Sequence, residues 1–278
     1  PSRGLGDVYK RQVFIYFSKK CNILFILKER KMKKIFKFFV MVFALTSGNL
    51  FSQQFASTGI EVNFGINSIN PVATLNNVTA YMESDDFNSL GISAGLYQVN
   101  TNGSDSTTHS IAFYYSDTEE LQKAYDVSLT SQAVATLLMN SAKNGTTNTN
   151  ESTYINTREK ITPEDVAKNT TFYIWRIKTA DVPRYLKDWD KLISEIENNG
   201  TAADSYGLKV TFAGGIKDED LFVWAGYESQ KEMMDQLAIF NASQSSIDFN
   251  RKISSYTETV STEIWSQINL WNGEAYTE

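Results

Sequence analysis

The chain has 278 residues, of which 42% are hydrophobic and 13% aromatic, so it can fill a folded core and is not wholly disordered. Residues 1–52 carry 11 basic and 2 acidic residues, whereas residues 53–278 carry 15 basic and 30 acidic residues. This acidic balance argues against nucleic acid and anionic membrane surfaces as partners. The one cysteine, Cys21, excludes a disulfide scaffold and leaves no thiol nucleophile in residues 53–278.

The first 52 residues are not expected to belong to the folded domain. Met32 opens a lysine-rich start, an apolar segment, and a small and polar stretch that ends at Ser52, the three parts of a secretory signal peptide. The apolar segment is shorter than the about 20 residues that a membrane-spanning helix needs. Residues 1–31 resemble translated adapter and upstream DNA; the alternative is a basic membrane-binding arm. We therefore expect a signal peptide at 32–52, a periplasmic or extracellular protein, and no membrane contact after cleavage.

A first set of strands and helices is expected in residues 58–160. Asn70 followed by Pro71 predicts a helix start, because proline is favoured at the first helical position. Strands are expected at 60–66, 91–100, 107–115 and 153–158, and a helical region from the Ser116–Glu119 capping box to about residue 143. The Thr/Asn run at 146–150 is interpreted as a loop.

The same order of elements is expected again in residues 170–271. Strands are expected at 171–178, 206–216, 221–227 and 260–270, and helices at 182–196 and after the Ser229–Glu232 capping box. Between the two sets, Thr162 and Pro163 predict a short helix in a linker at 161–169. The acidic turn Asp218-Glu219-Asp220 is expected to be solvated.

Both sets follow the order strand–helix–strand–strand–helix–strand, which predicts two tandem ferredoxin-like units. Shifting the first set by 112 residues places Pro71 on Pro183 and Gly95 on Gly207, which favours an internal duplication. The alternative is one α+β domain whose elements happen to alternate. Helices would cover one face of each antiparallel sheet, and we expect the two bare, apolar faces to pack together.

Such an arrangement resembles the dimeric α+β barrel superfamily, with both halves in one chain. The resemblance covers residues 58–271 and rests on the order of elements alone. The superfamily includes small monooxygenases and haem-degrading enzymes, and its pockets lie between a sheet and the helices of the same unit. The resemblance therefore implies an α+β fold and a pocket in one of the two units.

Four side chains are candidates for ligand binding: Arg176, Trp224, Tyr173 and His109. Arg176 lies mid-strand and either pairs with a carboxylate or binds an anionic ligand. All five tryptophans lie in the second unit, so Trp224 and Tyr173 either line a pocket there or fill the core. His109 is the only histidine, and is either a general base, a haem ligand or a half-exposed strand residue. No metal site is predicted, because zinc sites of two or three histidines are excluded.

No complete catalytic constellation is apparent, which favours a non-catalytic exported binding or structural protein without a cofactor. The alternative is an enzyme of the small-monooxygenase or haem-degrading kind, with an open pocket in one unit and haem as the cofactor. The partner is expected to be a small molecule or a protein, and the sequence favours no particular oligomeric state.

Overall fold

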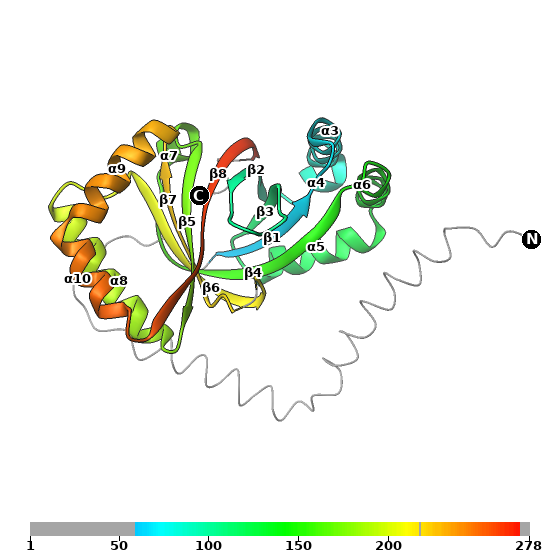
Figure 1. Ribbon diagram of the computed structural model, residues 1–278. Coiled ribbons are helices and arrows are strands. Elements are labelled where there is room, and N and C mark those ends of the chain that lie inside the picture. Colours follow the sequence, from blue (N-terminus) through cyan, green and yellow to red (C-terminus); the bar gives the residue numbers. More distant parts are fainter. Residues whose placement is uncertain (1–58, 217, 273–278) are drawn as a thin grey trace, which may run out of the picture. The chain divides into compact units, whose positions relative to one another are not determined.

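The computed structural model describes residues 59–216 and 218–272, so the expectations for residues 1–52 lie outside this part. In it, eight antiparallel strands close into a barrel, and eight helices lie outside the barrel, which gives a mixed α+β fold (Figure 1). The strands are β1 (Ile60–Asn67), β2 (Ser93–Thr101), β3 (His109–Tyr115), β4 (Thr147–Lys160), β5 (Thr171–Thr179), β6 (Ser205–Gly214), β7 (Leu221–Tyr227) and β8 (Thr257–Trp271). The helices are α3 (Pro71–Met82), α4 (Asp85–Asn88), α5 (Thr118–Thr130), α6 (Gln132–Lys143), α7 (Pro163–Lys168), α8 (Val182–Asn198), α9 (Gln230–Ala242) and α10 (Gln244–Ile253). Within the described residues, no helix is long and apolar enough to cross a membrane.

The barrel contains two runs of four strands in the same order, β4-β1-β3-β2 and β8-β5-β7-β6. We call these runs, with the helices that cover them, the first half and the second half. The halves are joined edge to edge, because β2 pairs with β8 and β4 pairs with β6. Each seam contains register shifts, which bend the strands and help the sheet to close. Closure pairs the edge strands that separate sheets would leave open.

Helix starts follow the local signals in the sequence. The Asn70 side chain accepts a hydrogen bond from the Ala73 amide at 3.2 Å, and Pro71 opens α3. Thr162 forms the capping box of α7, and the Ser229 hydroxyl accepts from the Glu232 amide at the start of α9. These starts agree with the predicted ones because each depends on residues only three positions apart.

Two predicted boundaries differ from the structure in the first half. The expected single helical region to residue 143 is two helices, because Ser131 ends α5 and its hydroxyl caps α6 by accepting from the Val134 amide at 3.0 Å. Asp117, rather than Ser116, caps α5. The predicted loop at 146–150 is wrong: β4 begins at Thr147 and pairs with β1. Pairing with a distant strand overrides the loop-like composition of this run.

Apolar cores lie between each half of the barrel and its helices, and Figure 1 shows α3–α6 on one side and α8–α10 on the other. Successive side chains of a strand point to opposite faces of the sheet, so every second side chain points into the barrel and the others point toward the helices. Inside the barrel, aromatic residues such as Phe222 and Trp265 share the space with buried charged residues such as Glu61, Lys209 and Arg176. The expectation that two apolar faces meet there is therefore correct in part: a hydrophobic cluster from both halves lies in the interior, and buried charged side chains lie beside it.

Candidate functional site

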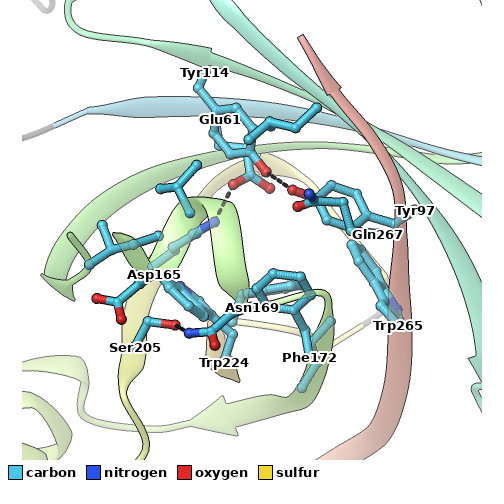
Figure 2. Close-up of a pocket in the computed structure, with 16 residues that line it drawn as sticks. Glu61, Tyr97, Tyr114, Asp165, Asn169, Phe172, Ser205, Trp224, Trp265 and Gln267 are labelled. Atoms are coloured by element: carbon cyan, nitrogen blue, oxygen red, sulfur yellow. Dashed lines mark hydrogen bonds and ion pairs between the residues drawn. The ribbon is translucent and has the colours of Figure 1, made fainter. Parts of the chain in front are cut away.

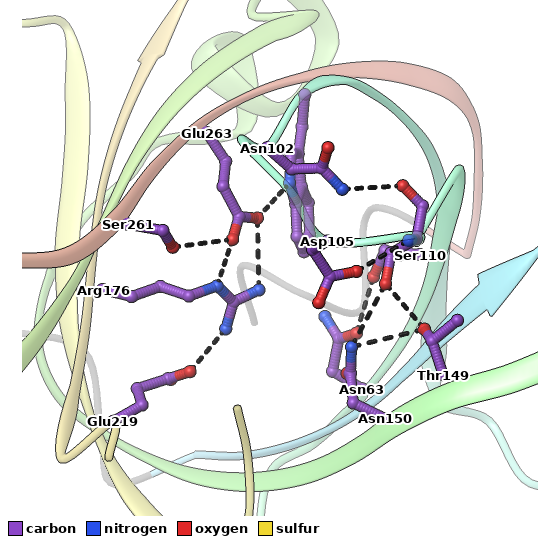
Figure 3. Close-up of polar contacts among 12 residues, drawn as sticks. Asn63, Asn102, Asp105, Ser110, Thr149, Asn150, Arg176, Glu219, Ser261 and Glu263 are labelled. Atoms are coloured by element: carbon purple, nitrogen blue, oxygen red, sulfur yellow. Dashed lines mark hydrogen bonds and ion pairs between the residues drawn. The ribbon is translucent and has the colours of Figure 1, made fainter. Parts of the chain in front are cut away.

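Arg176 lies inside the barrel and is paired with two glutamates. Its Nη1 donates to Glu219 Oε2 at 2.6 Å, and its Nε donates to Glu263 Oε1 at 2.5 Å (Figure 3). The three side chains are 4%, 0% and 4% exposed. Burial lowers the pKa of Arg176, but Tyr154 and the two carboxylates outweigh burial and raise the pKa well above its usual value. The guanidinium is therefore held by a buried ion-pair network.

The same network corrects the interpretation of the acidic turn between β6 and β7. Asp218 is half exposed and pairs with Lys178 at 3.1 Å, as a solvated turn residue does. Glu219 instead points inward to Arg176 and also accepts from the Thr211 hydroxyl at 3.4 Å. A solvated Glu219 was expected because its partner is 43 residues away along the chain.

The four predicted ligand-binding residues do not converge on one site. Arg176 and Tyr173 lie on opposite faces of β5, because they are three positions apart on one strand. Tyr173 packs against Trp175 on the face covered by helices, at a ring distance of 4.5 Å. Trp224 belongs to the hydrophobic cluster inside the barrel, and it also borders a cavity between the sheet of the second half and its helices. His109 lies in the first half, where its Nδ1 is 2.9 Å from the Thr108 hydroxyl and burial lowers its pKa.

The candidate site is a cavity of about 130 Å³ between the sheet of the second half and helices α8, α9 and α10. We call it the sheet–helix cavity. Its walls are mainly aromatic, and a few amides from the helices add polar groups. The aromatic residues are Trp175, Tyr185, Trp189, Tyr206, Trp224, Tyr227, Phe240 and Phe249, and the amides are Gln236, Asn241 and Asn250.

Helical periodicity and strand alternation bring these side chains together. Tyr185, Trp189 and Leu192 recur on one face of α8, which is the face that packs on the sheet. Tyr206 opens β6 and Tyr227 ends β7, and both point to the helix side of the sheet. The cavity is therefore built from regular elements and held by the second apolar core.

The tyrosines that line this cavity are held in the protonated form. Burial raises the pKa of Tyr185, Tyr206 and Tyr227 well above its usual value, and burial is the largest cause in each case. For Tyr206, the Glu197 carboxylate adds to the rise, because the hydroxyl donates to Glu197 Oε1 at 2.6 Å. Glu197 also accepts from Lys160 Nζ at 2.9 Å. The cavity is thus lined by three protonated tyrosines, and the hydroxyl of one of them, Tyr206, is hydrogen-bonded to the carboxylate of Glu197.

Tyr206, Tyr185 and Glu197 are not among the four residues predicted to bind a ligand. Alternation along the expected strand at 206–216 places Tyr206 on the same face as Leu208, and the α8 periodicity places Tyr185 with Trp189. These patterns predict that both tyrosines are buried. The contact between Tyr206 and Glu197 joins β6 to α8, and local patterns contain no signal for it.

No protein-family model matches the sequence, and no curated protein matches it. Solved structures match across most of the barrel. A provisionally assigned monooxygenase from Lactobacillus acidophilus is 7% identical, with 77% of this chain and 96% of that chain covered and a TM-score of 0.50. A provisionally assigned chlorite dismutase is 6% identical (79% and 97% covered, TM-score 0.47), and a haem-binding protein from Thermus thermophilus is 10% identical (79% and 93% covered, TM-score 0.45).

The chain shares its fold, a closed barrel covered by helices, with a solved structure of the dimeric α+β barrel type. Identities this low show the fold alone. The monooxygenase name of the barrel with a TM-score of 0.50 nevertheless contradicts our main expectation, a non-catalytic binding or structural protein, and favours the alternative of an enzyme. The expectation of no cofactor is contradicted with it, since the alternative that this name favours includes a haem cofactor.

Whether haem fits the sheet–helix cavity depends on the residues that line it. A haem iron takes an axial His, Cys, Met or deprotonated Tyr ligand. Within the described residues, no His, Cys, Met, Lys or Arg lines the cavity, and its three tyrosines have raised pKa values. Its volume is close to that of a cavity that holds one benzene ring, far below a porphyrin. The residues of this cavity therefore do not fit haem.

Proposed function

We propose that this protein is an enzyme of the small-monooxygenase type that oxidises a hydroxylated aromatic molecule with O₂ in the sheet–helix cavity. The observation that carries the proposal is an aromatic cavity lined by Tyr206, whose hydroxyl is hydrogen-bonded to the carboxylate of Glu197 on α8. The monooxygenase assignment of a barrel with the same fold is consistent with it.

Substrate binding depends on the aromatic walls. Trp175, Trp189 and Phe240 offer ring faces and edges to a planar substrate. The cavity volume of about 130 Å³ accommodates one ring, and a second ring would extend toward its open side. Phenols and naphthols match this space and also carry the hydroxyl group that a tyrosine recognises.

The Tyr206–Glu197 pair gives the site a route for a proton. The Tyr206 hydroxyl donates to Glu197, so its oxygen is free to accept the proton of a substrate hydroxyl while its own proton moves to the carboxylate. Loss of the substrate's hydroxyl proton makes the substrate ring electron-rich at the carbon para to that hydroxyl. Tyr185 and Tyr227 also line the cavity and have raised pKa values, and in this proposal their hydroxyls donate hydrogen bonds to the negative oxygen that forms.

The reaction balances without a further reductant. The hydroxyarene and O₂ give a para-quinone and water: the para C–H becomes C=O with one oxygen atom of O₂, and the other oxygen atom leaves as water. The substrate supplies the electrons that reduce O₂. The protein binds the ring, removes the hydroxyl proton and excludes bulk water from the carbanion-like ring.

Oxygen uptake with 1-naphthol tests the proposal, with ¹⁸O₂ as the label. We expect O₂ consumption, formation of 1,4-naphthoquinone, and one ¹⁸O atom in the quinone. Tyr206→Phe should lower kcat by about 100-fold, the lower end of what proton-transfer groups contribute. Tyr125→Phe, on α5 of the first half, is the matched control and should keep the wild-type rate. No label in the quinone, or equal rates for both variants, would refute the proposal.

We also propose that the two halves are tandem ferredoxin-like units, 58–160 and 170–271 with the linker at 161–169, that arose by duplication. Two pairs of elements support this: β3 and β7, and likewise α5 and α9, begin and end 112 residues apart. Residues 170–271 expressed alone should then pair with a second copy through the edges of β6 and β8. A monomer without a folded sheet would contradict this.

Export is the last part of the proposal. We propose that residues 32–52 are removed during secretion and that the folded part acts in the periplasm or outside the cell. The mass of the mature protein from a bacterial host should correspond to cleavage near Ser52. A product that keeps these residues in the cytoplasm would contradict export.

A further inference from the structure

The interior of the barrel contains a second cavity, which shares one lining residue, Trp224, with the sheet–helix cavity. It has a volume of about 60 Å³. It is bordered by Ile161, just before α7, and by Val166, in α7. We call it the interior cavity. Figure 2 shows Glu61, Tyr97 and Tyr114 on one side of it, and Asn169, Ser205 and Trp224 on the other. Its walls come from both halves, so it exists only in the closed barrel.

Two residues that line this cavity each carry a buried polar atom without a hydrogen-bond partner in the described part of the chain. Trp224 is 5% exposed, and within the described residues its indole Nε1–H donates to no acceptor. Asn169 is 2% exposed; its Nδ2 donates to Ser205 Oγ at 2.8 Å, whereas its Oδ1 accepts from no donor in this part of the chain. Buried polar atoms of folded proteins are nearly always hydrogen-bonded, so one free donor and one free acceptor in the same cavity point to a ligand.

The buried charged groups and the tyrosine hydroxyls of the cavity are already paired. Lys209 Nζ forms an ion pair with Glu61, and its ammonium also lies over the Phe222 ring, 5.4 Å from the centroid. The hydroxyls of Tyr97 and Tyr114 are hydrogen-bonded to each other at 2.7 Å. Because the buried charges neutralise one another, the cavity favours an uncharged ligand over an anion or a cation.

Shape restricts the ligand further. The volume of about 60 Å³ corresponds to roughly four buried non-hydrogen atoms, which is the size of an amide group with its flanking carbons. Phe172 and Trp265 add flat walls, and Tyr97 packs edge-on against Phe172 at a ring distance of 5.7 Å. A planar group with one acceptor and one donor fits these walls.

We propose that the interior cavity binds a small, neutral, planar amide or lactam. The ligand carbonyl accepts from Trp224 Nε1, and the ligand N–H donates to Asn169 Oδ1. The rest of the ligand extends toward α7 at the mouth. This site differs in position and polarity from the proposed oxidation site, and it does not depend on that function.

Calorimetric titration with two probes, 2-pyridone and benzamide, tests the proposal. At least one should bind the full chain with a Kd of about 1 mM or tighter, a range expected for molecules of this size. Trp224→Phe should weaken binding about tenfold, the effect of one neutral hydrogen bond. The blocked analogue 1-methyl-2-pyridone, which lacks the N–H group, should bind wild type about tenfold more weakly than 2-pyridone. Tyr206→Phe, which alters the sheet–helix cavity, should leave binding of both probes unchanged.

A second measurement covers the case in which Trp224→Phe does not fold. The indole N–H resonance of Trp224 in wild type should shift when the bound probe saturates the site. The proposal is overturned if neither probe binds at about 10 mM, or if the indole signal exchanges with water and does not respond to the probes. Binding that Trp224→Phe leaves intact and Tyr206→Phe abolishes would also overturn it, because the probe would then occupy the sheet–helix cavity.

Discussion

Replacing Arg176 by methionine removes the cation of the most deeply buried ion-pair network in the barrel interior. Glu219 and Glu263 would remain, with side chains 0% and 4% exposed, and among the described residues neither has an ion pair with another cation. Removing one partner of a buried pair costs about 3–5 kcal/mol, because the remaining charge stays in a site of low polarity. Since two carboxylates lose their partner here, we expect the free energy of unfolding to fall by at least the upper part of this range, a large share of the about 5–15 kcal/mol of a typical domain.

Urea unfolding, followed by tryptophan fluorescence and by far-UV circular dichroism, measures this loss. The triple variant Arg176→Met/Glu219→Gln/Glu263→Gln removes the charges as well as the cation, so it should recover most of the lost stability. Arg176→Lys keeps a charge but loses the two-pronged contact with Glu263, and we expect an intermediate value. A loss of less than about 1 kcal/mol for Arg176→Met, or a triple variant as unstable as the single one, would refute the reasoning.

Three further changes test other parts of the structure. Gly207→Ala places a Cβ 2.4 Å from Trp224 Nε1, so it should displace the indole and lower the free energy of unfolding by about 1–3 kcal/mol in urea titrations. Burial opposes ionisation of Asp188, but hydrogen bonds from Lys252 and Tyr256 outweigh it and hold the pKa of Asp188 below its usual value. The free energy that ionised Asp188 adds to folding is therefore complete above about pH 4 and is lost as the pH falls further. Asp188→Asn should flatten this acid limb of the curve of stability against pH. Ser131→Ala removes the α6 cap and the hydrogen bond to Asp86, which should cost about 1 kcal/mol and leave the far-UV spectrum unchanged. An unchanged midpoint for Gly207→Ala, an unchanged acid limb for Asp188→Asn, or a midpoint equal to wild type for Ser131→Ala would each contradict the corresponding contact.

The sequence predicted those elements that local chemistry determines. The Asn70–Pro71 start of α3, the Thr162 capping box and the apolar face of α8 depend on residues within a few turns of one another, so they can be recognised without tertiary information. The first residues of β4 could not be recognised in this way. Their Thr/Asn composition is typical of a loop, and the pairing with β1 that makes them a strand joins residues about 80 positions apart.

The candidate site was only partly predictable, for the same reason. Clustering of the tryptophans in the second half indicated where an aromatic cavity would form, and Trp175 and Trp189 do line it. The polar contacts were not predictable, because each depends on tertiary packing: Arg176 contacts Glu263 on the neighbouring strand β8 and Glu219 in the turn before the neighbouring strand β7, and Tyr206 on β6 contacts Glu197 on α8. Arginine in a strand shows that a partner is needed, but not which carboxylate supplies it.

A crystal structure of the protein grown with 1-naphthol tests the central claim most directly. The proposed oxidation in the sheet–helix cavity predicts a naphthol ring between α8 and the sheet, with its hydroxyl within hydrogen-bonding distance of the Tyr206 oxygen. Naphthol bound elsewhere, or a sheet–helix cavity that stays filled by its own side chains under the same conditions, would contradict it.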